Sequence, residues 1–353
     1  MDTTVISSQE PRLTSLAHGG GCGCKIAPNV LQEILRGASP LPVPPQLLVG
    51  IETSDDAAVY QIDDDKALVA TTDFFMPVVD DPHDFGRIAA TNAISDVYAM
   101  GATPLFALAL VGMPVGKLST TTIGKILDGG ASACRAAGIP IAGGHTIDSV
   151  EPIYGLVAIG LVDPANLKRN CDARAGDVLI LGKPLGVGIF SAALKKEQLS
   201  VAAYSQMIDA TTRLNTPGPR LARLPGVHAM TDVTGFGLGG HALEMARGSN
   251  LRLNIDWKSV PLLQGVKDLA QAGFVTGASG RNWTSYGDGI ELAASLGDID
   301  RTLLCDPQTS GGLLVACAPD AVDEGMAIFR DEGFAEARII GQIEAGAPSV
   351  VVA

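Results

Sequence analysis

Several aspartates of this 353-residue chain lie in segments of small and apolar residues, and that placement limits how the chain can fold. These aspartates are Asp55, Asp56, Asp73, Asp96 and Asp232. No Lys or Arg lies in the same segments. A carboxylate near a core must be neutralised, hydrogen-bonded or bound to a metal ion. For any one of them, a helix cap or a turn is the simpler interpretation. Taken together, and with Thr72 and Asn92 beside them as further hard ligands, they predict a site for Mg²⁺, which prefers carboxylate and phosphate oxygens.

The acidic charge balance restricts the possible partners. Lys and Arg total 25 and Asp and Glu total 38, which gives a formal net charge of −13. A chain this acidic is a poor candidate for binding nucleic acid through its overall field, so we expect no direct nucleic-acid partner. An anionic ligand must instead be bound locally, through metal ions, backbone N–H groups or a few cations. No apolar run approaches the ~18 residues of a spanning helix, so we expect no membrane partner either.

Cysteine usage and the N-terminal residues bear on the compartment. The six cysteines of the chain do not resemble a disulfide framework. The first residues have neither the basic start nor the apolar core of a secretory signal. We therefore expect a reducing, cytoplasmic compartment.

Composition and periodicity divide the chain into three parts. A glycine- and proline-rich arm and linker occupies residues 1–44, an N-terminal domain residues 45–165, and a C-terminal α+β domain residues 166–353. In the N-terminal domain, helical periodicity at Asp84–Met100 and Thr121–Ala137, between short apolar runs, predicts the order β-β-β-α-β-α-β. This order is typical of an α+β layer, in which helices cover a mostly antiparallel sheet.

The arm carries the run Cys22–Lys25 (CGCK) directly after three glycines. A loop this rich in glycine loses much backbone entropy when it is ordered, so we expect residues 1 to about 24 to be mobile without a ligand and to lie outside the core. Two thiols beside a cation favour a reactive thiolate, because Lys25 would lower the thiol pKa and could also meet a phosphate. The alternatives are a metal clip that recruits His18 and an oxidisable thiol pair.

Glycine motifs elsewhere suggest close contacts with a ligand. Gly235–Gly240 fits the GxGxxG dinucleotide fingerprint, but the preceding strand is short. Asp232 would also repel a pyrophosphate there unless a metal ion lay between them. The run Gly143–Thr146 follows a strand that we expect to end at Ala142, and glycines at a strand end let a ligand approach the backbone. The turn Thr309–Gly312 is interpreted as structural.

Seven segments, spread over nearly the whole chain from Leu13, resemble those of the selenophosphate synthetases, also called selenide, water dikinases. The matching segments are His18–Ile26, Asp55–Tyr60, Thr71–Pro77, Ala90–Asp96, Ala142–His145, Met230–Gly237 and Asp306–Gly312. They occur in the order of the family, which makes the resemblance highly specific. The nucleophile position, selenocysteine in some members, is Cys22 here.

The resemblance implies a fold, an activity and its ligands. The fold is α+β, with two α/β-layered domains of the aminoimidazole ribonucleotide synthetase-like type, and the N-terminal sheet forms a barrel across a homodimer. The family makes selenophosphate from ATP, selenide and water and releases AMP and orthophosphate. Magnesium assists transfer of the γ-phosphoryl group to selenide, and ADP is then hydrolysed. Mg²⁺ is the implied cofactor, K⁺ an additional monovalent cation, and ATP a substrate.

The implied partners follow from the same resemblance. A second copy of the chain would share the ATP site. Selenide, or a selenium-delivery protein, would supply the selenium, and the product would pass to the selenocysteine and selenouridine tRNA pathways.

Carried over residue by residue, the resemblance implies roles for three groups of side chains. Cys22 and Lys25 would be catalytic. Mg²⁺ would be bound by Asp56, Asp96 and Asp232. ATP would be contacted by residues of both subunits, the last three from the neighbouring one: Lys25, Thr53, Ser54, Asp55, Asp73, Asp96, Gly144, His145 and Thr146.

Two other functions stay open from the sequence. Another ATP-dependent enzyme of the same superfamily would use the aspartates without Cys22 and Lys25. A non-catalytic selenium-binding regulator would keep only the fold. The intact Cys22, Lys25 and aspartates favour the enzyme over the regulator.

Overall fold

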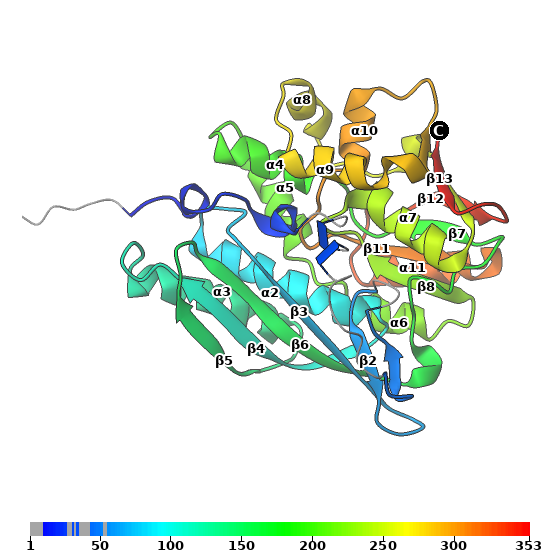
Figure 1. The fold of residues 1–353 in the computed structure, drawn as a ribbon, viewed down its shortest axis with the longest axis horizontal. Helices are drawn as coiled ribbons and strands as arrows, with labels where there is room; N and C mark the ends of the chain where they lie inside the picture. Colours follow the sequence, from blue (N-terminus) through cyan, green and yellow to red (C-terminus); the bar gives the residue numbers. More distant parts are fainter. Residues whose placement is uncertain (1–9, 27–29, 32, 35–42, 52–54) are drawn as a thin grey trace, which may run out of the picture.

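The computed structural model describes residues 10–26, 30–31, 33–34, 43–51 and 55–353. Within these residues the chain forms two β-sheets, of six and seven strands, with helices packed against them (Figure 1). The N-terminal sheet lies at the lower left of Figure 1 and the C-terminal sheet at the upper right. No helix in this part of the chain is both long and apolar enough to cross a membrane.

The N-terminal sheet is largely antiparallel, as predicted. Its strands follow the order β1-β2-β3-β6-β4-β5, and of the neighbouring pairs only β4 and β5 run parallel. Every second residue of β3 is buried, so one face of the sheet faces the core. The strands are β1 (Leu47–Val49), β2 (Ala58–Gln61), β3 (Ala67–Phe75), β4 (Thr103–Met113), β5 (Ile141–Asp148) and β6 (Ile153–Val162).

Two long helices cover one face of this sheet, and the periodicity predicted both. They are α2 (Pro82–Ala99) and α3 (Thr120–Ala136). Asp81 caps α2 by accepting a hydrogen bond from the Asp84 N–H. The helices approach closely because residue 86 is glycine: a Cβ on Gly86 would lie 1.9 Å from a carbonyl oxygen of α3.

Strand β5 extends beyond its predicted end at Ala142. Its pairing with β4 continues to Asp148, so the run Gly143–Thr146 is part of the strand and not a loop that follows it. Glycine is needed at Gly144, because a Cβ there would lie 2.1 Å from the Ala109 carbonyl oxygen on β4. The local glycine content suggested a strand end, but pairing with the long strand β4 decides how far β5 runs.

The C-terminal sheet is mixed, with the strand order β10-β13-β9-β12-β7-β11-β8. Its strands are β7 (Val178–Leu181), β8 (Val227–Asp232), β9 (Arg252–Ile255), β10 (Ile290–Leu292), β11 (Leu313–Cys317), β12 (Arg338–Glu344) and β13 (Ser349–Val352). Strand β8 lies at an edge of this sheet and contacts α2 of the first. The C-terminal end of β8 and helix α2 therefore meet where the two sheets adjoin.

The remaining helices surround the C-terminal sheet or connect the elements. The α-helices are α4 (Val187–Lys195), α5 (Val201–Thr211), α6 (Gly218–Ala222), α7 (Gly237–Ser249), α8 (Val266–Gln271), α9 (Gly277–Tyr286), α10 (Asp298–Leu304) and α11 (Val322–Asp331). The 3-10 helices are η1 (Leu13–Leu16), η2 (Gly21–Cys24), η3 (Pro164–Asn166), η4 (Trp257–Ser259), η5 (Gly287–Gly289) and η6 (Pro319–Ala321).

Candidate active site

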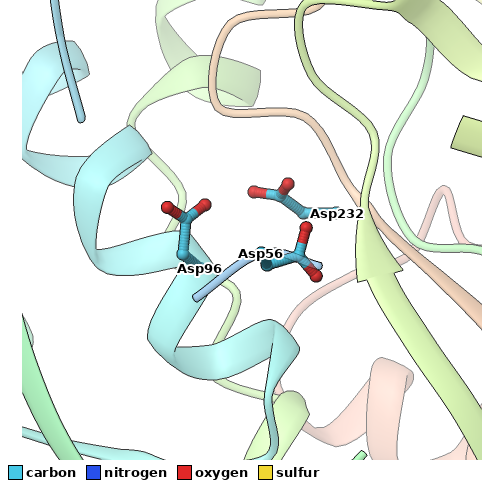
Figure 2. A group of neighbouring side chains, drawn as sticks. All are labelled: Asp56, Asp96 and Asp232. Carbon is cyan, nitrogen blue, oxygen red and sulfur yellow. The ribbon is translucent and has the colours of Figure 1, made fainter. Parts of the chain in front are cut away.

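Three aspartates from distant parts of the sequence meet where the two sheets adjoin (Figure 2). Asp56 lies just before β2, Asp96 near the C-terminal end of α2, and Asp232 at the end of β8. Each offers a carboxylate oxygen, and these oxygens all lie within 4.8 Å of one another. The structure therefore brings together the three residues predicted to bind metal, which we call the aspartate triad.

Threonine hydroxyls hold two members of the triad. Thr231 Oγ1 donates a hydrogen bond of 2.8 Å to Asp56 Oδ1, and Thr71 Oγ1 donates one of 2.5 Å to Asp96 Oδ2. The second oxygen, Asp56 Oδ2, is buried and has no hydrogen-bond partner among the described residues. A buried carboxylate oxygen without a donor is unfavourable, so this atom is suited to bind a cation.

Asp232 is held by a serine that α2 provides. The Ser95 hydroxyl donates to Asp232 Oδ2, and Asn215 Nδ2 donates a hydrogen bond of 2.7 Å to Ser95 Oγ. Asp232 itself is 1% exposed. Consecutive residues of α2 thus serve two triad members, since Ser95 positions Asp232 and the next residue is Asp96.

Burial and mutual repulsion raise the pKa values of the aspartate triad. Burial raises the pKa of Asp56 and of Asp96 well above the ordinary carboxyl value, and the charge of Asp232 adds to both shifts. Burial also raises the pKa of Asp232, and the hydrogen bond from Ser95 opposes this shift. Three buried carboxylates ionise together only beside a positive charge. Their hard oxygens and the unpartnered Asp56 Oδ2 fit Mg²⁺.

A chain of polar contacts links Cys22 to Lys25 through α2 and β3. The Cys22 thiol donates to Asn92 Oδ1 over 3.1 Å. Asn92 Nδ2 in turn donates to Asp73 Oδ2. Lys25 Nζ lies 3.7 Å from the same Asp73 oxygen. We call this chain of four residues the Cys22–Lys25 relay, and it brings both predicted catalytic side chains close together.

The position of Cys22 differs from the predicted one. Its side chain is 1% exposed and belongs to the hydrophobic core, so the prediction of a thiol outside the core is wrong. Burial first, and then Asp73, raise the pKa of the Cys22 thiol well above its usual value, while Lys25 lowers it by less. The expected lowering of the thiol pKa by Lys25 is therefore outweighed. The error arose because the sequence shows the cation but not the burial.

Lys25 remains charged and partly accessible. Asp73 is the main cause that raises the pKa of Lys25, against the effect of burial. The Lys25 side chain is 41% exposed, and its Nζ is only loosely paired with Asp73 at 3.7 Å. The ammonium group can therefore meet an added anion.

The predicted alternative of a metal clip finds no support. Cys24 Sγ donates to the Gly21 carbonyl oxygen over 2.8 Å. His18 Nδ1 lies 2.9 Å from a Glu151 oxygen, so its partner is a carboxylate and not a thiol. In the described part of the chain, the metal-ligand cluster is the aspartate triad, and no cysteine belongs to it.

The residues predicted to contact ATP are only partly brought together. Asp73 and Lys25 lie in the relay, whereas Asp55 accepts a hydrogen bond of 3.3 Å from the Asn170 N–H, and burial raises the pKa of Asp55 to about 7. The run Gly144–Thr146 lies on the exposed edge strand β5, which β6 and β4 separate from β3. Thr53 and Ser54 lie outside the described residues.

Some residues that position the site were interpreted only as structural, or were missed. The turn at Thr309 and Ser310 is part of the site, because the Cys22 N–H donates to Thr309 Oγ1 over 3.2 Å and the Ser310 N–H donates to Asn92 Oδ1 over 2.8 Å. Gly235, in the GxGxxG match, packs against the same loop: a Cβ there would lie 2.9 Å from the Cys22 carbonyl oxygen. These contacts join residues far apart in sequence, so no local pattern reveals them.

Comparison with known proteins identifies the family. The model of the AIR synthase related protein, N-terminal domain, matches residues 54–162, and that of its C-terminal domain matches residues 174–353. A protein named selenide, water dikinase from Pseudomonas straminea is 66% identical over 343 residues, which are 97% of this chain and 96% of the relative. The chain belongs to the selenide, water dikinase family. A further member of the family, from Rhizobium meliloti (strain 1021), is 59% identical over 342 residues, 97% of this chain and 98% of the relative.

Solved structures share the fold at low sequence identity. A thiamine-monophosphate kinase from Stenotrophomonas maltophilia K279a is 23% identical, with a TM-score of 0.61 over 93% of this chain and 96% of that one. The hydrogenase maturation protein HypE from E. coli is 18% identical, with a TM-score of 0.63 over 93% of this chain and 94% of that one. These matches support the predicted fold class of two AIR synthase-type α/β domains, and the family assignment rests on the close relatives.

Proposed function

We propose that this protein is a selenophosphate synthetase, which converts ATP, selenide and water into selenophosphate, AMP and orthophosphate. The observation that carries this proposal is the aspartate triad beside the Cys22–Lys25 relay, in a chain 66% identical to a named selenide, water dikinase. The triad alone would suit another ATP-dependent enzyme of this fold. The cysteine and lysine in the relay favour the selenium reaction.

The triad residues Asp56, Asp96 and Asp232 would hold Mg²⁺. When bound, the metal ions supply positive charge next to the phosphates, which an acidic protein otherwise lacks. The chain's own hydroxyls keep the carboxylates in place, as the contacts of Thr71 and Ser95 indicate. We also propose that a monovalent cation such as K⁺ takes part.

The transfer step then depends on the loop that ends in Lys25. Selenide is itself a strong nucleophile and attacks the γ-phosphorus of ATP. A selenium–phosphorus bond forms, the bond from that phosphorus to the bridging oxygen breaks, and ADP leaves. The exposed Lys25 ammonium meets the charge that develops on the phosphoryl group. The Cys22 thiol, held by Asn92, would handle or position the selenium, and a water molecule later hydrolyses ADP.

The second copy of the chain would pair with the open face of the N-terminal sheet. Phe74 on β3 and Tyr60 on β2 are 51% and 44% exposed, on the face opposite the buried one. A partner that covers this face would bury both aromatic rings. Its edge strand β5 would contribute Gly144–Thr146 to the shared ATP site, because these residues do not reach the triad within one chain. A selenium-delivery protein, the selenocysteine and selenouridine tRNA pathways and a cytoplasmic location complete the proposal.

Phosphorus NMR tests the proposed function directly. Purified protein with Mg²⁺, ATP and selenide under anaerobic conditions should form selenophosphate, AMP and orthophosphate in equal amounts. ATP turnover that is indifferent to selenide would favour another enzyme of the superfamily. Selenide binding without any turnover would favour the non-catalytic regulator.

A further inference from the structure

A groove on the C-terminal domain is lined by more cations than carboxylates, and it shares no residue with the aspartate triad or the relay. Its walls come from α5, the loop after β7, the residues from η4 to Gln264 and the start of β12. The volume of the groove is about 440 Å³, which lies in the range of sites for small organic molecules. The charged lining residues are Lys183, Asp209, Arg213, Lys258, Glu336 and Arg338. Four cations against two carboxylates give the groove a formal charge of +2, although the net charge of the chain is −13.

Most of this positive charge is not neutralised by a neighbouring carboxylate. Arg213 Nη1 lies 2.9 Å from Glu336 Oε2, and in the described part of the chain this is the one ion pair among the cations of the groove. Arg338 Nη1 donates to two backbone carbonyl oxygens, over 2.8 Å each. Arg338 and Lys258 are both exposed. Their charges are therefore available to an added anion.

Lys183 lines the groove but is only 2% exposed. Its Nζ donates to the Arg213 carbonyl oxygen over 2.6 Å and to the Ser310 carbonyl oxygen over 2.8 Å. An ammonium group has three N–H donors, so the contacts within the described residues leave one for a ligand. Burial lowers the pKa of Lys183 to about 7, and an anion next to it would favour the charged form. A buried cation of this kind is suited to an anionic ligand.

Backbone and side-chain hydrogen bonds hold the walls of the groove together. The Leu185 N–H donates to the Pro261 carbonyl oxygen and the Leu263 N–H donates to the Leu185 carbonyl oxygen, over 2.9 Å each. The Gln264 N–H donates to Gln206 Oε1 on α5 over 3.1 Å. The loop after β7, the loop after η4 and helix α5 are thus joined, so the groove is formed before any ligand binds.

The uncharged part of the lining suits the organic part of a phosphate ester. Pro184, Pro261 and Leu262 contribute apolar surface, and Gln206 contributes an amide group that can donate to a sugar or a base. The groove also has more room than a bare phosphate ion fills. Arginine and lysine bind phosphate oxygens through charge-assisted hydrogen bonds, so the charged part of the lining suits the phosphate group.

We propose that this groove is a second anion site, which binds a nucleoside monophosphate with its phosphate group against Lys183, Lys258 and Arg338. The site would be separate from the one that takes ATP, because the aspartate triad and the relay contribute no side chain to it. Lys183 also holds the turn at Ser310, whose N–H donates to Asn92 of the relay. The test therefore leaves Lys183 in place and changes the two exposed cations.

The test is calorimetry of AMP, adenosine and inorganic phosphate, each titrated into the whole protein in EDTA. Without Mg²⁺ the aspartate triad repels phosphate, so the groove is the site that remains for AMP. We expect AMP to bind at one site per chain with a Kd on the order of 1 mM or lower. Adenosine and inorganic phosphate should each bind at least about tenfold more weakly, because each can make only part of the contacts.

Variants of the exposed cations connect the binding to the groove. Lys258→Gln and Arg338→Gln should each weaken AMP binding about tenfold, the effect of one lost hydrogen bond between charged groups. Arg223→Gln removes an exposed arginine outside the groove, so it is the matched control and should bind AMP as the wild type does. The melting temperature of each variant without AMP should stay within a few degrees of the wild type.

Three results would overturn the proposal: no AMP binding in EDTA, binding of adenosine or inorganic phosphate as tight as that of AMP, or an unchanged affinity for AMP in Lys258→Gln and Arg338→Gln. The experiment uses neither Mg²⁺ nor selenide. Its failure therefore leaves the proposed function standing, and a wild type that forms no selenophosphate leaves the proposal for the groove standing.

Discussion

Replacing Asp96 by Asn should stabilise the metal-free protein and remove most of its stabilisation by Mg²⁺. The triad oxygens lie within 4.8 Å of one another, and two unit charges at that distance repel by about 3.5 kcal/mol at an effective dielectric constant near 20. Burial and repulsion already raise the pKa of Asp96, so partial protonation relieves some of this energy. The remaining gain from Asp96→Asn is on the order of 1–2 kcal/mol. The Asn oxygen can still accept the hydrogen bond from Thr71.

Thermal unfolding with EDTA and with Mg²⁺ measures this effect. A gain of this size raises the melting temperature by roughly 2–8 °C in EDTA. In Mg²⁺ the wild type should gain stability by mass action, by about 2.7 kcal/mol at a hundred times the Kd, and the variant much less. Asp64→Asn, in an exposed turn, is the control and should leave both melting temperatures unchanged. If Asp96→Asn melts no higher than the wild type in EDTA and gains as much from Mg²⁺, the triad is not a metal site.

Other variants test individual contacts. Cys22→Ser should lose most selenophosphate formation by phosphorus NMR, whereas Cys24→Ser, whose thiol donates to a backbone carbonyl outside the relay, should lose little. Equal losses would show that both thiols are required. Thr309→Val should leave the buried Cys22 N–H without its acceptor, at a cost of ~1–3 kcal/mol, and so lower the melting temperature by roughly 2–10 °C. Thr309→Ser keeps the hydroxyl and should melt as the wild type does. A normal melting temperature for the Val variant would contradict the contact. Burial raises the pKa of Asp306 to about 7, so the folded protein loses stability as the pH rises from about 4 to 7. Asp306→Asn should flatten that part of the plot of melting temperature against pH, and an unchanged slope would refute the shift in pKa.

The sequence was informative where the deciding interaction is local. The periodicity predicted α2 and α3 to within two residues at either end, and the apolar runs around them predicted the largely antiparallel sheet that they cover. The aspartate positions could also be singled out, because an aspartate in an apolar segment is unfavourable wherever it lies unless a partner is found. The choice of Asp56, Asp96 and Asp232 among them came from the resemblance to the family. Chemistry of this kind needs no knowledge of which segments meet.

The errors concern residues whose surroundings come from distant segments. The Cys22 N–H bonds to Thr309, 287 residues away, and this contact helps bury a loop that its glycine content alone marks as mobile. The pKa of Cys22 follows the burial and not the neighbouring Lys25. Strand β5 is long because β4 pairs with it, although its glycines favour an end. In each case tertiary packing outweighs the local preference.

A crystal structure of the protein with Mg²⁺ and a non-hydrolysable ATP analogue tests the central claim most directly. We predict metal ions about 2.0–2.1 Å from carboxylate oxygens of Asp56, Asp96 and Asp232, bridging to the phosphates, with Lys25 next to the γ-phosphoryl group. Triad carboxylates without metal, and a triphosphate bound elsewhere, would contradict the account.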